Sequence, residues 1–141
     1  IIKLVISGDS FVPHAGSHTT IMSEEEVAAA AEVAHAHGKR LSAHARSAES
    51  VKRCVRHGIK VVYHANYADE EALDMLEANK DWIFVSPNLG FTAIAAYEGS
   101  DWFTEEQVKA MGFREELESA VKGIKELMKR GVRILGGGDY G

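Results

Sequence analysis

The sequence predicts an α/β fold that forms part of a (β/α)8 TIM-type barrel. Short apolar runs alternate with helical patterns along the chain, which is typical of right-handed βαβ units around a parallel sheet. Residues that bind metals recur at the ends of several of these runs. In a barrel the carboxyl ends of the strands meet on one face, where active sites are built. An open doubly wound sheet fits less well, because SGDSF after the first run lacks the G-x-G-x-x-G turn.

The first strand is expected at residues 1–6, a nearly continuous apolar run of the kind that is buried on both faces of a sheet. A polar loop with the sequence GDSFVPHAGSHTT follows it. The first helix should begin after Ser23, because Ser23 and Glu26 have the spacing of a capping box. It should end at Gly38, since glycine is the commonest residue just after a helix.

The later elements continue this alternation, with apolar residues at helical spacing and glycines after several of the helices. We expect further strands at residues 40–44, 59–63, 82–86 and 132–136. We expect further helices at residues 47–57, 69–79, 104–111 and 114–130, and an irregular aromatic segment at residues 88–103.

The composition is that of an ordinary globular domain, with 45% hydrophobic and 26% charged residues, so residues 1–141 are expected to form a single domain. A net charge of -5 favours neither nucleic acid nor an anionic membrane surface. The apolar runs are shorter than the roughly 20 residues that span a bilayer, and no signal-peptide pattern opens the chain. Cys54 is the only cysteine, which favours a cytoplasmic location.

The two ends of the sequence lie next to expected strands. Ile1 and Ile2 begin directly inside an apolar run, and Gly141 closely follows the last one. Domain termini are usually found in frayed surface segments rather than within such elements. We therefore expect this sequence to be a piece of a longer protein.

Four residues are candidate metal ligands because they lie within or just after the expected strands: Lys3, His44, His64 and Asp139. The barrel would bring these positions together although they are far apart in the sequence. Two imidazoles and a carboxylate suit zinc or a similar divalent ion. Asp139 could also accept a proton from a metal-bound water, so it is the candidate catalytic residue. This pattern indicates a metal-dependent hydrolase.

Lys3 leaves a second function open. A lysine within a buried strand is costly as a cation unless it is paired, neutralised or modified. A desolvated lysine in a barrel could instead form a Schiff base, as in an aldolase or lyase. A third alternative is a barrel fragment with no catalytic role.

Several motifs resemble the amidohydrolase superfamily, particularly its imidazolonepropionase-like and Xaa-Pro dipeptidase-like branch. They are IK in the first strand, SEEEVAAAAEVAHAHGK, AHA, an H-A pair in the next unit and a glycine-flanked aspartate. The segments GGDYG and AHARSAESVK look closest to members that hydrolyse carbamate, thiocarbamate or phenylurea C–N bonds.

The resemblance implies that the chain is the C-terminal portion of the barrel, about strands four to eight. Lys3 would be carboxylated and bridge two metals, His44 and His64 would be ligands from strands five and six, and Asp139 would be a ligand and the acid/base. The H-x-H motif of the first strand is absent, so one or two ions, most naturally zinc, would need ligands from outside this sequence. The intact protein would cleave an amide, carbamate or urea C–N bond with a metal-activated hydroxide, while the fragment alone would be inactive.

The resemblance also implies a small-molecule substrate, and a homo-oligomer is compatible with it. Arg46 occupies the position of a second histidine in the AHAH motif of many relatives, where a guanidinium could hold a carboxylate or carbonyl oxygen. Tyr97 is a candidate for an aromatic wall of the substrate pocket together with Trp102 and Phe103. Tyr140, next to Asp139, is a further candidate substrate contact.

Overall fold

Five parallel strands form one sheet in the sequential order β1-β2-β3-β4-β5 in the computed structural model, which describes residues 1–99 and 101–139. The strands are β1 (Ile2–Val5), β2 (Leu41–Ser47), β3 (Val61–Tyr67), β4 (Phe84–Ser86) and β5 (Arg133–Ile134). Sequential pairing of parallel strands is the arrangement of a (β/α)8 barrel. The predicted fold class, a partial barrel, is therefore confirmed.

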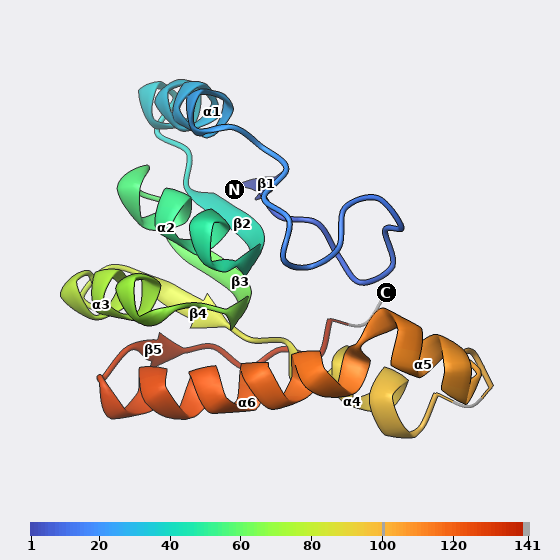
Figure 1. The fold of residues 1–141 in the computed structure, drawn as a ribbon. Coiled ribbons are helices and arrows are strands. Elements are labelled where there is room, and N and C mark those ends of the chain that lie inside the picture. The colour runs from blue at the N-terminus through green and yellow to red at the C-terminus, as the bar shows by residue number, and fades with distance from the viewer. Residues whose placement is uncertain (100, 140–141) are drawn as a thin grey trace.

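Helices follow the strands and form an outer arc around the sheet, as Figure 1 shows for α1, α2, α3 and α6. The helices α4 and α5 lie beyond the carboxyl ends of the strands, next to the first half of α6 (Figure 1). The helices are α1 (Glu24–Ala36), α2 (Ala48–Arg56), α3 (Glu70–Ala78), α4 (Leu89–Tyr97), α5 (Glu105–Met111) and α6 (Phe113–Lys129). None of the helices in the described residues is long and apolar enough to cross a membrane.

The helix starts are encoded locally. Ser23 Oγ accepts a hydrogen bond from the Glu26 amide at 3.2 Å, and the Glu26 carboxylate accepts one from the Ser23 amide at 2.7 Å. This is the predicted capping box, and Thr104 and Gln107 form a second one at the start of α5.

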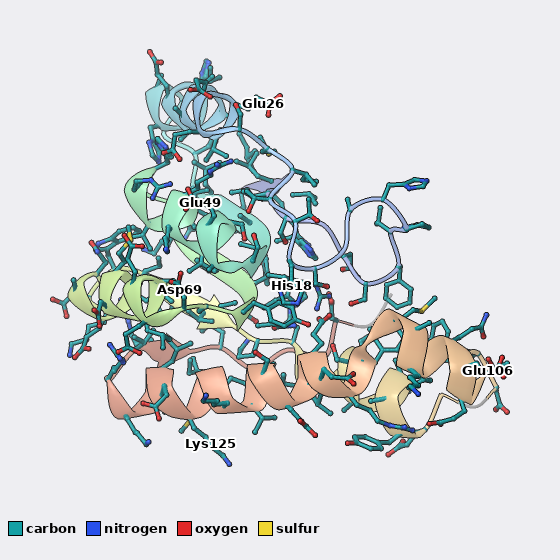
Figure 2. All side chains as sticks on the ribbon, viewed as in Figure 1. His18, Glu26, Glu49, Asp69, Glu106 and Lys125 are labelled. Carbon is teal, nitrogen blue, oxygen red and sulfur yellow. The ribbon has the colours of Figure 1, made fainter. Side chains whose placement is uncertain are left out.

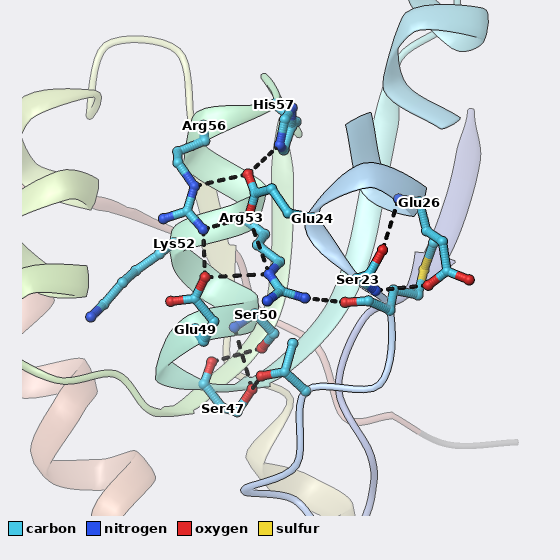
Figure 3. Close-up of polar contacts among 12 residues, drawn as sticks. Ser23, Glu24, Glu26, Ser47, Glu49, Ser50, Lys52, Arg53, Arg56 and His57 are labelled. Carbon is cyan, nitrogen blue, oxygen red and sulfur yellow. Dashed lines mark hydrogen bonds and ion pairs between the residues drawn. The ribbon is translucent and has the colours of Figure 1, made fainter. Parts of the chain in front are cut away.

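An ion-pair cluster joins the start of α1 to α2 (Figure 3). Its members are Glu24, Glu49, Arg53, Arg56 and His57. Glu24 accepts hydrogen bonds from Arg56 at 2.7 and 3.0 Å and lies 2.5 Å from His57 Nε2. The cluster therefore fixes the position of α1 against α2 on the outer surface.

The main core lies between the outer face of the sheet and the helices. Buried aliphatic side chains on the outer face of the strands meet those of the helices, and many are completely buried. They include Leu41, Ala43, Val62, Val85, Val27, Val51, Leu76 and Leu127. A smaller second cluster, formed by Ala95, Ala96, Val108 and Phe113, joins α4 and α5 to α6.

Three sequence-based expectations were wrong. The first strand is not buried on both faces, because Ile2 and Val5 are 39% and 51% exposed. The segment 88–103 is not entirely irregular, because residues 89–97 form α4. Asn88 before this helix has φ +52° and makes no side-chain cap, so packing of Ala95 and Ala96 against Phe113 stabilises the helix in place of a local start signal. The strands β2 and β3 also continue three or four residues past their predicted ends, since the ladder reaches the pair Ser47 and Tyr67.

Candidate metal centre

His44 projects from the middle of β2 on the inner face of the sheet. It pairs with Val5 of β1, and Lys3 lies on the same face because it precedes Val5 by two residues. The His44 Nε2 nitrogen lies 3.1 Å from the Gly8 carbonyl oxygen. A carbonyl can only accept a hydrogen bond, so Nε2 carries the hydrogen and Nδ1 carries the lone pair. His44 Nδ1 is therefore prepared to act as a ligand.

His64 lies beside His44 because β3 departs from regular alternation. A regular strand would place His64, which pairs with Ala45, on the face opposite His44. His64 and Ala65 have φ values of +79° and +53°, and the register shifts between Ala45 and Ser47. This irregularity redirects the side chain. The His44 and His64 ring centroids are 4.6 Å apart.

The surroundings of the two rings keep them neutral. Burial lowers the pKa of His64 to about 2, and the nearby positive charge of Arg46 contributes to the same effect. Burial also lowers the pKa of His44, although the hydrogen bond to the Gly8 carbonyl opposes that change. Metal ligation requires unprotonated imidazole, so both rings have the right protonation state near neutral pH.

Asp139 approaches His64 from the segment after β5. Its Oδ2 atom lies 3.8 Å from His64 Nε2, and its side chain is 38% exposed. The Phe91 amide donates a hydrogen bond to the Gly138 carbonyl at 2.9 Å, which ties this segment to α4. A Cβ on Gly137 would lie 2.2 Å from Asn88 Oδ1, so a larger residue there would displace the Asn88 side chain or this segment. The backbone therefore holds the Asp139 carboxylate at the histidine pair.

Backbone strain is concentrated at this end of the sheet. The non-glycine residues with positive φ in the described residues are His64, Ala65, Asn88 and Asp139. All of them lie at or near the carboxyl ends of β3, β4 and β5. Such conformations cost on the order of 1–3 kcal/mol each and persist where the surrounding structure imposes them, often at functional sites.

Lys3 lies near this group without touching the histidines. It is exposed, and its Nζ atom lies 4.7 Å from the centroid of the Tyr63 ring. Its charge is among the influences that lower the pKa of both His44 and His64, which places it within electrostatic reach of the pair. On the inner face Lys3 thus lies one layer below His44 along the strands, while Asp139 approaches from the segment after the sheet.

The side chains at this end of the sheet could supply some, but not all, of the ligands of a metal ion. His64 Nδ1 is buried without a regular hydrogen-bond partner in the described residues, although a backbone hydrogen bond to Pro87 is among the influences on the pKa of this ring. No three side chains among the described histidines, cysteines and acidic residues are close enough to hold an ion by themselves. The residues present therefore match part of a metal site, with two neutral imidazoles and a nearby carboxylate.

Arg46, predicted to bind substrate, pairs with carboxylates in this structure. Its guanidinium contacts Asp9 at 3.0 Å and also contacts Glu116, a residue of α6. Neither carboxylate was predicted as part of the site. Asp9 lies in the loop shortly after the first strand, a position that could have identified it, whereas Glu116 has no signal in its local sequence.

The aromatic residues that were predicted to line the substrate pocket differ in their exposure. Tyr97 is 65% exposed and its ring lies 5.5 Å from the Arg114 guanidinium, while Trp102 is also exposed. Phe103 packs 5.3 Å from the Phe113 ring. Tyr140 lies outside the described residues. Nearer the strand ends, His18 of the β1–α1 loop stacks on Tyr67 with the ring centroids 3.7 Å apart, and Figure 2 labels His18.

Solved structures resemble nearly the whole chain. A Xaa-Pro dipeptidase with methionine bound in its active site has a TM-score of 0.82 and 25% identity, and the match covers 99% of this chain and 34% of that one. A protein described as an amidohydrolase has a TM-score of 0.81 and 25% identity, with 99% and 33% covered. The A. niger ochratoxinase has a TM-score of 0.81 and 23% identity, with 98% and 30% covered.

The chain thus spans 30–34% of the length of these proteins. No protein-family model and no curated protein sequence matches it. The matches extend over at least 98% of the chain. Fold and motifs together confirm the resemblance of this chain to the amidohydrolase superfamily.

Proposed function

We propose that the intact protein is a metal-dependent hydrolase that cleaves an amide, carbamate or urea C–N bond. The observation that carries this proposal is the pair of neutral, adjacent imidazoles of His44 and His64 beside the Asp139 carboxylate. The similar structures include an amidohydrolase and a dipeptidase, which supports the same class of reaction.

We propose that His44, His64 and Asp139 supply part of the ligand set of a divalent ion, with zinc as the expected one. A second ion would need Lys3 in carboxylated form and an H-x-H motif outside these residues. A metal bound at these residues would supply Lewis-acid chemistry to the attacking water and the scissile carbonyl.

The protein's own groups carry the proton transfer and the positioning. Asp139 is partly exposed and anchored through its backbone, so its carboxylate can accept a proton from the attacking water and return it to the leaving nitrogen. The Gly8 carbonyl holds the His44 ring in one tautomer and orientation. Arg46, Tyr97 and Tyr140 remain the proposed substrate contacts, and Arg46 would have to exchange a carboxylate partner for the substrate.

The experiment uses the full-length protein, stripped of metal with a chelator and reloaded with zinc. Substrates would include Xaa-Pro dipeptides, N-acyl amino acids, phenylcarbamates and phenylureas. Asp139→Asn should lower kcat at least about 100-fold, because a positioned general base contributes that much or more. The matched control is Asp101→Asn, which removes an exposed aspartate and should leave kcat unchanged. Full activity of Asp139→Asn, or no metal-dependent hydrolysis of any substrate, would contradict the proposal.

The Schiff-base alternative requires a desolvated Lys3, whereas Lys3 is exposed in this structure. Borohydride reduction with substrate tests it directly, because only a Schiff base gives a stable adduct at Lys3. We expect no adduct by mass spectrometry. We further propose a small-molecule substrate and a homo-oligomeric assembly. We also propose a cytoplasmic location, and the single buried Cys54 is the main support for that location.

A further inference from the structure

Glu116 is a buried carboxylate at the carboxyl-end face of the sheet. Its side chain is 2% exposed, although it belongs to a helix whose neighbouring residue Glu115 is exposed. A carboxylate removed from water must be compensated by hydrogen bonds or by an opposite charge. Its burial therefore depends on the partners around it.

Four donors from three parts of the chain surround this carboxylate. Oε1 accepts hydrogen bonds from Arg46 of β2 and from Asn66 Nδ2 of β3, the latter at 2.6 Å. Oε2 accepts hydrogen bonds from Ser17 at 2.8 Å and from Ser10, both in the β1–α1 loop. One side chain of α6 thus holds together two strand ends and the loop that follows β1.

Arg46 links Glu116 to a second carboxylate, that of Asp9. Its guanidinium is 4% exposed, with Nη1 directed at Glu116, while Nε and Nη2 contact Asp9 Oδ2 at 3.1 and 3.0 Å. One cation is shared between two carboxylates, so this triad has one negative charge that is not balanced within it. That surplus favours a cation nearby.

Asp9 in turn lies next to His44 of the candidate metal centre. Its Oδ2 atom lies 3.6 Å from His44 Nε2, the same nitrogen that donates to the Gly8 carbonyl. A carboxylate and a carbonyl beside Nε2 both favour the hydrogen on that nitrogen, which leaves Nδ1 as the ligand atom. A continuous path of polar contacts therefore runs from Glu116 through Arg46 and Asp9 to His44.

We propose that Glu116 is a positioning residue of the metal centre, acting through Arg46 and Asp9 on the orientation and tautomer of His44. This inference deepens the proposed function, since it assigns a role around the same site. It also gives Arg46 a structural role, the link between Glu116 and Asp9, that does not require contact with the substrate. Glu116 would touch neither the metal nor the substrate.

The test compares Glu116→Gln with Glu118→Gln in the full-length protein. Both changes remove one charge from α6 and keep the side-chain size, but Glu118 is exposed. The first measurement is the tautomer of His44, read from the ring nitrogen chemical shifts in the metal-free protein. Glu116→Gln should convert the single Nε2–H tautomer of His44 into a mixture, and Glu118→Gln should not.

The second measurement is binding of Co²⁺ followed by calorimetry and by its visible spectrum. Glu116→Gln should weaken binding about tenfold, the usual effect of removing a group that orients a ligand, and should alter the spectrum. A variant that lowers only the melting temperature, with an unchanged His44 tautomer and unchanged Co²⁺ binding, would show that Glu116 is merely structural and would overturn the inference. Absence of hydrolytic activity with an altered tautomer would instead count against the proposed function alone.

A second variant covers the case in which Glu116→Gln fails to fold. Asp9→Asn breaks the path at a side chain that is 24% exposed and therefore easier to change. It should give the same tautomer mixture and the same loss of Co²⁺ affinity. Where both variants fold, the double variant should lose no more affinity than either single one, because the two residues act along one path. An unchanged His44 in Asp9→Asn, or fully additive losses in the double variant, would overturn the inference.

Discussion

Glu24 offers a quantitative prediction of acid stability. The hydrogen bond from Arg56 is the strongest influence that lowers the pKa of Glu24 to about 2, from a normal value of 4.5. A depressed pKa means that the folded protein prefers the charged form, so the contribution to stability is present above pH 4.5 and is lost as the pH falls towards 2. The full shift corresponds to about 3.4 kcal/mol. Because Glu24 is 38% exposed, solvent screening reduces this to about 1 kcal/mol.

The assay is urea unfolding of metal-free protein, followed by circular dichroism at several pH values. Glu24→Gln should be about 1 kcal/mol less stable than the wild type at pH 6.5, and roughly half of that difference should be gone at pH 3.5. Glu25→Gln is the matched control, because Glu25 shares the first turn of α1 and the favourable effect of a helix start on negative charge. A difference between Glu24→Gln and wild type that stays constant from pH 6.5 to pH 3.5 would refute the reasoning.

The remaining predictions concern other parts of the fold. Complete burial raises the pKa of the Cys54 thiol, so iodoacetamide at pH 8 should label it only after unfolding in urea, as read by mass spectrometry. Gly137→Ala should reduce hydrolysis by the full-length protein at least tenfold, because the new Cβ displaces the Asp139 segment, whereas Gly136→Ala, with no atom within 4 Å, should retain activity. Ser23→Ala should lower the unfolding free energy by about 1 kcal/mol through loss of the α1 cap, and an unchanged denaturation midpoint would contradict this.

Local signals in the sequence were sufficient for most elements of the fold. The capping box at Ser23 predicted the start of α1, because a cap depends only on residues within one helical turn. The sequence indicated that His44 and His64 lie at equivalent places on neighbouring parallel strands, and their ring centroids are 4.6 Å apart.

Features that depend on distant partners could not be predicted. The Glu116 carboxylate accepts a hydrogen bond from Arg46, which is 70 residues away in the sequence, and no local pattern identifies such a pair. The turn of His64 towards His44 depends on an irregular backbone at the end of β3, whereas a strand pattern assumes regular alternation. The helix α4 likewise depends on tertiary packing of Ala95 and Ala96.

The sequential order of the strands has a consequence for how the protein is made. Each strand pairs with the one synthesised just before it, so every βα unit can add to the sheet as it leaves the ribosome and close only a short loop. The contacts of Glu116 do not follow this sequential order, because its hydrogen bond with Ser10 joins residues 106 positions apart. These contacts of the β1–α1 loop can therefore form only after α6 has been synthesised. We expect the metal centre to be the last part of this chain to become ordered during folding, after the sheet that supports it.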